Sequence, residues 1–299
     1  MTDDARIPAF VNPDAGNAQD ACDALTAVGG FDIVEVTPDS LANRVQRAVT
    51  GGAKRVLVAG GDGSIGAAAG VLTRSGVELA ILPVGTLNHL ARDLSIPLDV
   101  EAAARVARSG TAIPIDAGSV NDKIFLNTSS VGSYAMFVRM RERFEHVLGY
   151  HIASFIAAAR LFVRLPLYRV TVRVDERTHE YLTPLVFVGV SERELKLPAL
   201  GARIAGGRTG LHVMVIRRRS GARALALGLA AAARGVDAVA ATPAMDAFFV
   251  DSLRIEPRTH VISIDGELVH IGPVLEYRLL AGALRIVVPS DRTDGGTEG

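Results

Sequence analysis

The sequence predicts an α/β domain built on a parallel sheet, followed by a domain made mostly of antiparallel strands. Up to about residue 110, short apolar segments alternate with helix-length segments, which is the pattern of a parallel sheet covered by helices. After that point, strand-like segments dominate. A chain of 299 residues also exceeds the usual size of one hydrophobic core, so two domains are expected.

In the N-terminal domain, each predicted strand ends in a turn of glycine or small polar residues and leads into a helix. The expected strands are Ile7–Val11, Phe31–Val36, Val56–Ala59 and Leu79–Leu82. The expected helices are Ala15–Val28, Pro38–Val49, Ile65–Ser75 and Val100–Arg108. Ligands collect at the carboxyl ends of parallel strands. The residues expected to meet there in one crevice are Asn12, Thr37, Asp62 and Thr86.

The C-terminal domain is predicted to begin with a hairpin and to continue as strands interrupted by two helical segments. The hairpin pairs Ile113–Val120 with Ile124–Ser129, and the helical segments are Ser133–Leu165 and Arg223–Arg234. The later strands are Tyr168–Asp175, Leu185–Val190, Leu211–Ile216, Phe248–Ile255, Val261–Ile264, Leu275–Leu279 and Leu284–Val288. The domains are expected over residues 1–115 and 116–289, with the strand at 284–289 packing back on the first. The polar tail 290–299 is expected to be disordered.

Two glycine turns in the N-terminal domain favour a phosphate site. The strand from Val56 runs into Gly60-Gly61-Asp62-Gly63, and Ser64 is expected to cap the next helix. Such a turn brings backbone N–H groups, a helix N-terminus and one carboxylate to the same point. The following strand leads to Gly85, Thr86 and Asn88, which repeat the design. Either turn alone is equally consistent with a purely structural role.

Composition excludes several classes of protein. Apolar residues make up 49% and charged residues 21% of the chain, which excludes general disorder. The formal net charge is zero, so no global field attracts nucleic acid. The lone Cys22 cannot form an internal disulfide, as expected in a reducing cytoplasm. No signal peptide is expected at the start, and arginines interrupt the longest apolar stretches, so any membrane association is expected to be peripheral.

Four motifs together carry a family resemblance. They are Asn12-Pro13-Asp14-Ala15-Gly16, Gly60 to Ser64, Pro83 to Arg92, and Asp265-Gly266-Glu267. In these motifs and their order the chain resembles the diacylglycerol kinase and sphingosine kinase family of lipid kinases, from residue 7 to residue 289. The resemblance implies an N-terminal domain like that of NAD kinase and diacylglycerol kinase, and a β-sandwich-like C-terminal domain.

The resemblance also implies a function, an ATP-dependent transfer of phosphate to a lipid hydroxyl, with diacylglycerol as the expected acceptor. Mg²⁺ would accompany the ATP phosphates, and Asp62 would orient them. The implied nucleotide-binding residues are Asn12, Thr37, Gly60, Gly61, Asp62, Gly63, Ser64, Ile65, Gly66, Thr86 and Asn88. Without the resemblance, Asn12 and Thr37 are equally typical of a turn and a helix cap. The implied partners are ATP, a lipid alcohol and a membrane surface, and a homodimer is left open.

The Asp265-Gly266-Glu267 motif is expected to supply the acceptor side of the chemistry. It follows an apolar strand, so its glycine is expected to make a tight turn that exposes both carboxylates. The family resemblance makes Glu267 the proton acceptor for the lipid hydroxyl. Asp265 is expected to orient Glu267 or to bind metal, so Glu267, Asp265 and Asp62 are the candidate catalytic residues. The alternative is an ordinary hairpin tip, for which Asp-Gly is a strong signal.

The chain departs from the family pattern in two places. Gly66-Ala67 follows Ile65 where bacterial relatives usually have Asn-Glu. Thr209-Gly210 stands where relatives place an Asp-Gly that helps to hold a structural magnesium, and His212 stands where another acid is common. Threonine lacks the charge that Mg²⁺ needs in a site with few ligands, so no metal ligand is assigned.

Two other functions stay open at the level of sequence. An NAD kinase or phosphofructokinase-like enzyme uses a similar glycine turn, although the motif from Pro83 to Arg92 argues against both. A non-catalytic lipid- or nucleotide-binding relative is the second alternative. Clustered basic residues could contact anionic lipid, or they could form an ordinary solvated face. These basic residues are Arg139, Arg141, Arg143, Arg160, Arg164, Arg217, Arg218 and Arg219.

Overall fold

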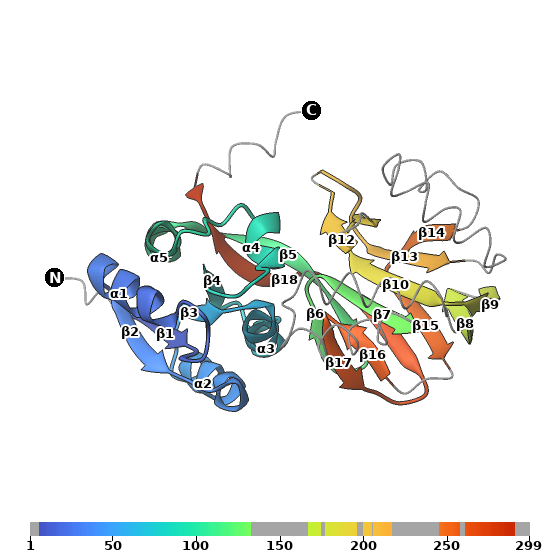
Figure 1. Cartoon of the computed structure of the whole chain (residues 1–299), viewed down its shortest axis with the longest axis horizontal. Coiled ribbons are helices and arrows are strands. Elements are labelled where there is room, and N and C mark those ends of the chain that lie inside the picture. The colour runs from blue at the N-terminus through green and yellow to red at the C-terminus, as the bar shows by residue number, and fades with distance from the viewer. Residues whose placement is uncertain are drawn as a thin grey trace. The chain divides into compact units, whose positions relative to one another are not determined.

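The computed structural model describes residues 6–132, 167–174, 177–195, 200–204, 206–216, 245–257 and 261–290 (Figure 1). The chain divides into two compact units. The first unit comprises Met1–Ala117 and Leu280–Gly299, and the second unit comprises Gly118–Leu279. The predicted helices at 133–165 and 223–234, the basic clusters and nearly all of the tail lie outside the described residues.

The first unit is a parallel sheet with helices on it. Its strands run in the order β2-β1-β3-β4-β18, and β1, β2, β3 and β4 pair in parallel. The last strand of the chain, β18, pairs in parallel with β4. The strands are β1 (Ile7–Val11), β2 (Phe31–Glu35), β3 (Arg55–Gly60), β4 (Glu78–Pro83), β5 (Thr111–Val120) and β18 (Leu275–Val288). The helices are α1 (Ala18–Val28), α2 (Pro38–Thr50), α3 (Asp62–Leu72), α4 (His89–Asp93) and α5 (Val100–Ser109).

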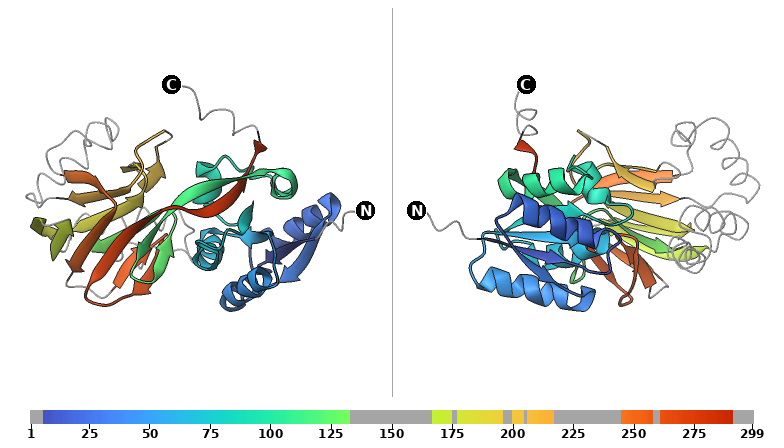
Figure 2. Two further views of the ribbon diagram at one scale, coloured as in Figure 1. Left: turned by 180° about the vertical axis from the view of Figure 1, so that it is seen from behind. Right: turned by 60° about the vertical axis from the view of Figure 1, so that its left-hand side comes forward.

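Two pairs of helices cover this sheet. Helix α1 packs beside α5, and α2 packs beside α3, as Figure 2 shows from two sides. The central strands β3 and β4 are buried along almost their whole length, which explains their continuous apolar runs. The predicted α/β class is confirmed, and this architecture places the carboxyl ends of β1 to β4 along one edge.

The second unit consists of antiparallel strands in two main sheets. Its strands are β6 (Lys123–Phe125), β7 (Thr128–Gly132), β8 (Tyr168–Val174), β9 (Arg177–Thr183), β10 (Leu185–Val190), β11 (Arg193–Leu195), β12 (Leu200–Arg203), β13 (Leu211–Ile216), β14 (Met245–Val250), β15 (Ser252–Pro257), β16 (Val261–Ile264) and β17 (Glu267–His270). One sheet has the order β14-β13-β10-β7-β16-β17. The other contains β18, β15, β8 and β9 in that order. The predicted antiparallel domain is therefore confirmed.

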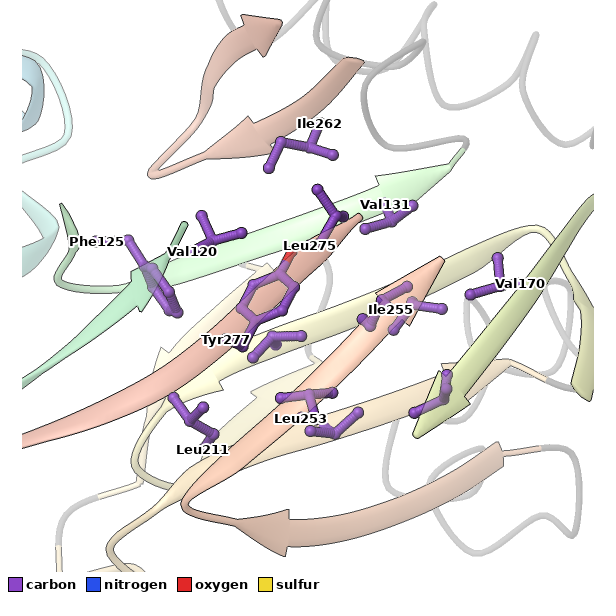
Figure 3. Packing of buried hydrophobic residues seen from close by; sticks show 14 of the residues in the cluster. Val120, Phe125, Val131, Val170, Leu211, Leu253, Ile255, Ile262, Leu275 and Tyr277 are labelled. Atoms are coloured by element: carbon purple, nitrogen blue, oxygen red, sulfur yellow. The ribbon is translucent and has the colours of Figure 1, made fainter. Parts of the chain in front are cut away.

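The two sheets of the second unit share one hydrophobic core. Ile262 and Val131 come from the six-stranded sheet, while Ile255, Leu275 and Tyr277 come from the other (Figure 3). The ring of Tyr277 lies edge-on to Phe125, and its hydroxyl is 3.0 Å from the hydroxyl of Ser129. This layered packing holds β7 and β16, the strands beside the Asp265-Gly266-Glu267 motif.

Candidate nucleotide and acceptor sites

The residues that follow β1, β2, β3 and β4 lie along the same edge of the first unit. The N–H of Asn12 donates to the carbonyl of Ala59 at 3.3 Å, which places the end of β1 beside the end of β3. The N–H of Val84 donates to the carbonyl of Gly60 at 3.4 Å, which places the end of β4 on the other side of β3. The two glycine turns are therefore direct neighbours.

Helix α3 begins within the first glycine turn. Gly61 is its N-cap, with an extended backbone, and the N–H of Ile65 donates to the carbonyl of Gly61 at 3.1 Å. The expectation that Ser64 caps this helix is wrong, because Asp62, Gly63 and Ser64 already form its first turn. The backbone N–H groups of that turn have no carbonyl one helical turn before them. They form the positive end of an 11-residue helix, where a phosphate group is stabilised.

Three glycines let the two turns touch. A Cβ atom added to Gly85 would lie 2.4 Å from the Cα of Gly61, which is a backbone atom that cannot move aside. A Cβ atom added to Gly60 would lie 2.5 Å from the Cβ of Ser64, in the first turn of α3. Only glycine permits this approach. Gly60 and Gly85 are therefore required by packing, independently of any ligand.

The carboxylate of Asp62 connects the two glycine turns. Its Oδ2 accepts a hydrogen bond from the N–H of His89 at 3.2 Å, and its Oδ1 accepts a weaker one from Leu90 at 3.5 Å. These are the first two residues of α4, so Asp62 satisfies N–H groups at the start of a neighbouring helix. The side chain is half-buried, whereas the sequence suggested a carboxylate exposed to a ligand.

Asn88 shapes the second glycine turn. It has a left-handed backbone, with φ of 51°, and is buried. Its Oδ1 accepts from the N–H of Gly85 at 3.1 Å, and its Nδ2 donates to the carbonyl of Gly85 at 2.7 Å. The guanidinium of Arg92 donates to the carbonyl of Leu87 at 3.0 Å. The Asn88 amide thus closes the turn, while Thr86 lies exposed on it.

Asn12 and Thr37 have local roles that the sequence left open. The Oδ1 of Asn12 accepts from the N–H of Asp14 at 3.1 Å and forms a turn with it. Thr37 precedes α2, and both its N–H and its hydroxyl donate to the hydroxyl of Ser40 at 3.1 Å. Both residues lie at the predicted edge of the sheet.

In the second unit, Asp265 and Gly266 form a two-residue hairpin turn between β16 and β17. Both have positive φ, 46° and 90°, as a type I′ turn requires. Glu267 is the first residue of β17 and pairs with Ile264 across the hairpin. Its side chain is exposed. The turn therefore presents Glu267 to solvent, in agreement with the expectation for that carboxylate.

The expectation that Asp265 is also exposed is wrong. Its carboxylate accepts hydrogen bonds from three consecutive backbone N–H groups, those of Leu126 at 2.8 Å, Asn127 at 2.9 Å and Thr128 at 2.8 Å. Burial raises the pKa of the Asp265 carboxyl, while the three donors and the charge of Arg193 act in the opposite direction. Asp265 thus ties the hairpin to the segment between β6 and β7.

Arg193 was not among the residues predicted to matter for the site. It is the first residue of β11, and its positive charge favours the ionised form of Asp265. Arg193 is only 3% exposed, and its guanidinium donates to the carbonyls of Val190 at 2.8 Å and Leu126 at 3.3 Å. Its neighbours Ser191, Glu192 and Glu194 are polar, so the sequence is typical of a solvated loop. No local pattern distinguishes this arginine from an exposed one.

Comparison with known proteins finds matches mainly in the segment that carries the two glycine turns. Residues 6–120 match the family model of the diacylglycerol kinase catalytic domain. A probable lipid kinase of Cronobacter sakazakii, named YegS-like, is 37% identical over 114 residues, which are 36% of this chain and 38% of that protein. A YegS-like probable lipid kinase of Pseudomonas aeruginosa is 44% identical over 90 residues, 29% of this chain and 30% of its own.

The match to the diacylglycerol kinase catalytic domain model covers residues 6–120. This domain contains both glycine turns and Asp62, but not Asp265 or Glu267. The matched segments span less than two fifths of the length of these curated relatives.

The fold of the whole chain agrees with this assignment. A crystal structure of a diacylglycerol kinase from Bacillus anthracis superimposes with a TM-score of 0.66 at 18% identity, covering 95% of this chain and 97% of the other. Another structure from that organism gives a TM-score of 0.72 at 19% identity with the same coverage. At this identity the likeness concerns the fold, and it extends beyond the diacylglycerol kinase catalytic domain to the second unit.

The residues near Thr209 do not fit the structural metal that the family resemblance implies. Thr209 is uncharged, and the imidazole of His212 stacks on Phe249 with ring centroids 4.4 Å apart. The Nδ1 of His212 accepts the N–H of Arg193 at 3.1 Å, so this nitrogen is already used. Among the described residues, no group of three or more His, Cys, Asp or Glu gathers as a metal site. Within the same residues, no helix has the length and apolar character needed to cross a membrane.

Proposed function

We propose that this chain is an ATP-dependent lipid kinase that transfers the γ-phosphate of ATP to a lipid hydroxyl, with diacylglycerol as the acceptor. The observation that carries the proposal is the pair of touching glycine turns, in the segment that matches the diacylglycerol kinase catalytic domain model. Phosphoryl transfer depends mostly on positioning and on neutralising charge, and such turns supply both.

The nucleotide is proposed to bind at the edge formed by the ends of β1 to β4. The N–H groups in the first turn of α3 would receive phosphate oxygens, and Gly66 leaves the helix surface beside them open, because an added Cβ would meet no atom within 4 Å. Asn12, Thr37 and Thr86 lie along the same edge as nucleotide contacts. Asn88 is proposed to contribute indirectly, because its side-chain amide holds the Gly85 turn in the shape that faces the nucleotide.

Mg²⁺ is proposed to arrive with the nucleotide. Asp62 is the acidic residue of the glycine turns and would contribute a carboxylate oxygen to that ion. When bound, the ion neutralises phosphate charge during transfer. The hydrogen bonds that the Asp62 carboxylate accepts from α4 fix its position at the start of α3. The same side chain would therefore bind the ion and hold the second glycine turn in place.

Glu267 is proposed as the base that accepts the proton of the lipid hydroxyl. An alcohol has a pKa far above 7, so a positioned carboxylate assists as the new O–P bond forms. Glu267 is exposed at the start of β17, and the described residues give its carboxylate no hydrogen-bond or ionic partner. Asp265 is proposed as a positioning residue, because its oxygens already accept three backbone N–H groups.

A lipid acceptor also implies peripheral contact with a membrane surface from the cytoplasmic side. Diacylglycerol is held in a bilayer, so the enzyme has to reach its hydroxyl at the surface. Binding of the chain to vesicles that contain the acceptor is therefore expected, and nothing in the proposal requires a spanning segment.

The experiment that tests the proposal is a transfer assay with radiolabelled ATP and Mg²⁺ on the full chain. The acceptors are diacylglycerol and other lipid alcohols in mixed micelles, together with NAD and fructose 6-phosphate. Label in lipid alone supports the proposal, and the acceptor labelled fastest identifies the lipid. Label in NAD or fructose phosphate would replace it with a small-molecule kinase. Binding of ATP without any labelled product would indicate a non-catalytic nucleotide-binding relative.

A further inference from the structure

A buried arginine lies behind the hairpin that carries Glu267. Arg193 is 3% exposed, and arginine is almost never buried to this degree unless its charge is paired and its N–H groups are bonded. Its Nε donates to the carbonyl of Val190 at 2.8 Å, and its Nη2 donates to the carbonyl of Leu126 at 3.3 Å. The charge of Arg193 also favours the ionised form of Asp265.

Arg193 and Asp265 hold the same peptide segment from two sides. The carboxylate of Asp265 takes the N–H of Leu126, while the guanidinium of Arg193 donates to the carbonyl of that same residue. Two backbone bonds complete the arrangement: the N–H of Val190 donates to the carbonyl of Asn127 at 3.0 Å, and the N–H of Asp265 donates to the carbonyl of Thr128 at 2.8 Å. The segment 126–128 therefore joins the hairpin turn to the end of β10.

Gly189 fixes the path of the arginine side chain. A Cβ atom added to Gly189 would lie 2.4 Å from the Cγ of Arg193 and 3.3 Å from its Cβ. The stem of the arginine thus runs directly over the glycine backbone of β10. Since the atoms in conflict belong to the inner part of the side chain, a larger residue at 189 would displace the guanidinium from its two carbonyls.

We propose that Arg193 is a positioning residue for Glu267. It balances the charge of Asp265 and holds the segment 126–128, and this segment in turn fixes the two-residue turn from which Glu267 projects. The inference rests on the proposed function only in giving Glu267 the role of base. Removing one partner of a buried charged pair leaves the other uncompensated, so loss of Arg193 loosens the Asp265 anchor.

The test compares Arg193→Met and Arg193→Lys with Arg173→Met in the full chain. Methionine removes the charge and keeps an apolar stem, whereas lysine keeps the charge and loses the planar fork. Arg173 is an exposed arginine on β8, in the same unit, and serves as the matched control. Two quantities are measured: amide hydrogen exchange of residues 126–128, and the kcat and KM for ATP with diacylglycerol as acceptor.

Arg193→Met is expected to speed exchange of these three amides by about tenfold or more. It is expected to lower kcat by roughly 10- to 100-fold, while KM for ATP stays within about twofold, because a small displacement of a reacting group is costly. Arg193→Lys is expected to restore part of both losses, and Arg173→Met to change neither.

Wild-type exchange at residues 126–128 in Arg193→Met would overturn the proposal. So would a general loss, in which KM for ATP and kcat worsen together and lysine restores nothing. If Arg193→Met does not fold, Arg193→Lys carries both readouts. If the wild-type chain phosphorylates no lipid, the proposed function fails, and the exchange measurement alone then decides whether Arg193 anchors the turn.

Discussion

Two aspartates, Asp62 and Asp265, lie beside glycines, the first at the start of α3 and the second in a hairpin turn, and in both the carboxylate accepts hydrogen bonds from backbone N–H groups of a distant segment. The partners lie 27 and 28 residues from Asp62 and 137 to 139 residues from Asp265. The sequence indicated correctly that Asp265 lies in a turn and that Glu267 is exposed, whereas Asp62, expected in the turn before a helix, is already the first residue of α3. It could not reveal which N–H groups the aspartates receive, because those partners are brought in by tertiary packing and leave no local pattern.

Asp62 is expected to contribute to stability as well as to activity. Asp62→Ala removes the acceptor for two N–H groups of α4 and should cost about 1 kcal/mol of the free energy of unfolding, as loss of a cap does. Asp62→Asn keeps an acceptor oxygen and should recover most of that loss. Both should lose most lipid kinase turnover, since neither carries the negative charge. Urea unfolding and the transfer assay measure the two effects, and a folded Asp62→Ala protein with normal turnover would remove Asp62 from the mechanism.

Glu267 is expected to matter for turnover and hardly at all for folding. Glu267→Gln keeps the size of the side chain and removes its basicity, so kcat should fall by about 10²–10⁴-fold while ATP affinity stays within a few-fold. The free energy of unfolding should change by less than about 0.5 kcal/mol, because the side chain is exposed. Steady-state kinetics with varied ATP provide the check. Normal phosphorylation of lipid by this variant would show that another group accepts the proton.

The strands and helices of the first unit follow the sequence prediction within a few residues, because each apolar run ends in a glycine or proline turn. Three predictions in the second part of the chain were wrong. Residues 248–255 were expected as one strand, but a break at Asp251 sends β14 and β15 into different sheets. The strand expected at 124–129 divides into β6 and β7.

The strands expected at 275–279 and 284–288 are a single strand, β18, which passes through Gly282 at a φ of 55°. Alternation of apolar residues does not report which sheet a strand joins.

The contact between the two glycine turns is expected to be intolerant of a single methyl group. Gly85→Ala places a Cβ atom 2.4 Å from backbone of Gly61, so it should lower the free energy of unfolding by about 2 kcal/mol or more and abolish ATP binding. Gly70→Ala is the matched control, because Gly70 is exposed on α3 and a Cβ atom there meets nothing within 4 Å. That variant should gain about 0.5–1 kcal/mol. Equal stabilities of the two variants would contradict the packing argument.

On the scale of the whole molecule, the two units differ in how much of their architecture the sequence revealed. The parallel sheet of the first unit was predicted from the alternation of strand and helix segments. The fold of the whole chain resembles that of the B. anthracis structures over 95% of its length. Strands β9, β11, β12 and β17 were not predicted. These strands are short or polar, so their sequences lack the alternation of apolar and polar residues by which a strand is recognised.

His212 is expected to make the stability of the molecule depend on pH. Burial lowers the pKa of the His212 imidazole below its usual 6.5, although Glu192 acts in the opposite direction. As pH falls through 6.5, the unfolded chain therefore binds the proton first, and stability should decline, by at most about 1.4 kcal/mol per pH unit for one group. His212→Asn keeps an acceptor for the N–H of Arg193 and cannot titrate. Urea unfolding from about pH 7.5 to about pH 5.5 should show a steeper loss in wild type than in this variant. If the free energy of unfolding depends on pH equally in both proteins, His212 is not the cause of the pH dependence.

Stability should also be independent of divalent metal. Because Thr209 is neutral and His212 is stacked on Phe249, dialysis against EDTA should leave the Tm of the full chain unchanged within about 1 °C, while phosphate transfer still requires added Mg²⁺. Elemental analysis of the dialysed protein is the second measurement. A stoichiometric magnesium retained without nucleotide, or a fall of several degrees in Tm, would contradict this expectation.

The pairing of β18 with β4 has a consequence for synthesis on the ribosome. The partner of β4 emerges roughly two hundred residues after it, which corresponds to about 10–40 s of translation. During that interval the sheet of the first unit lacks one strand, and β4 presents an unpaired and strongly apolar edge. The nascent chain therefore exposes this apolar edge while the second unit is being made, and the sheet of the first unit is completed only when β18 emerges.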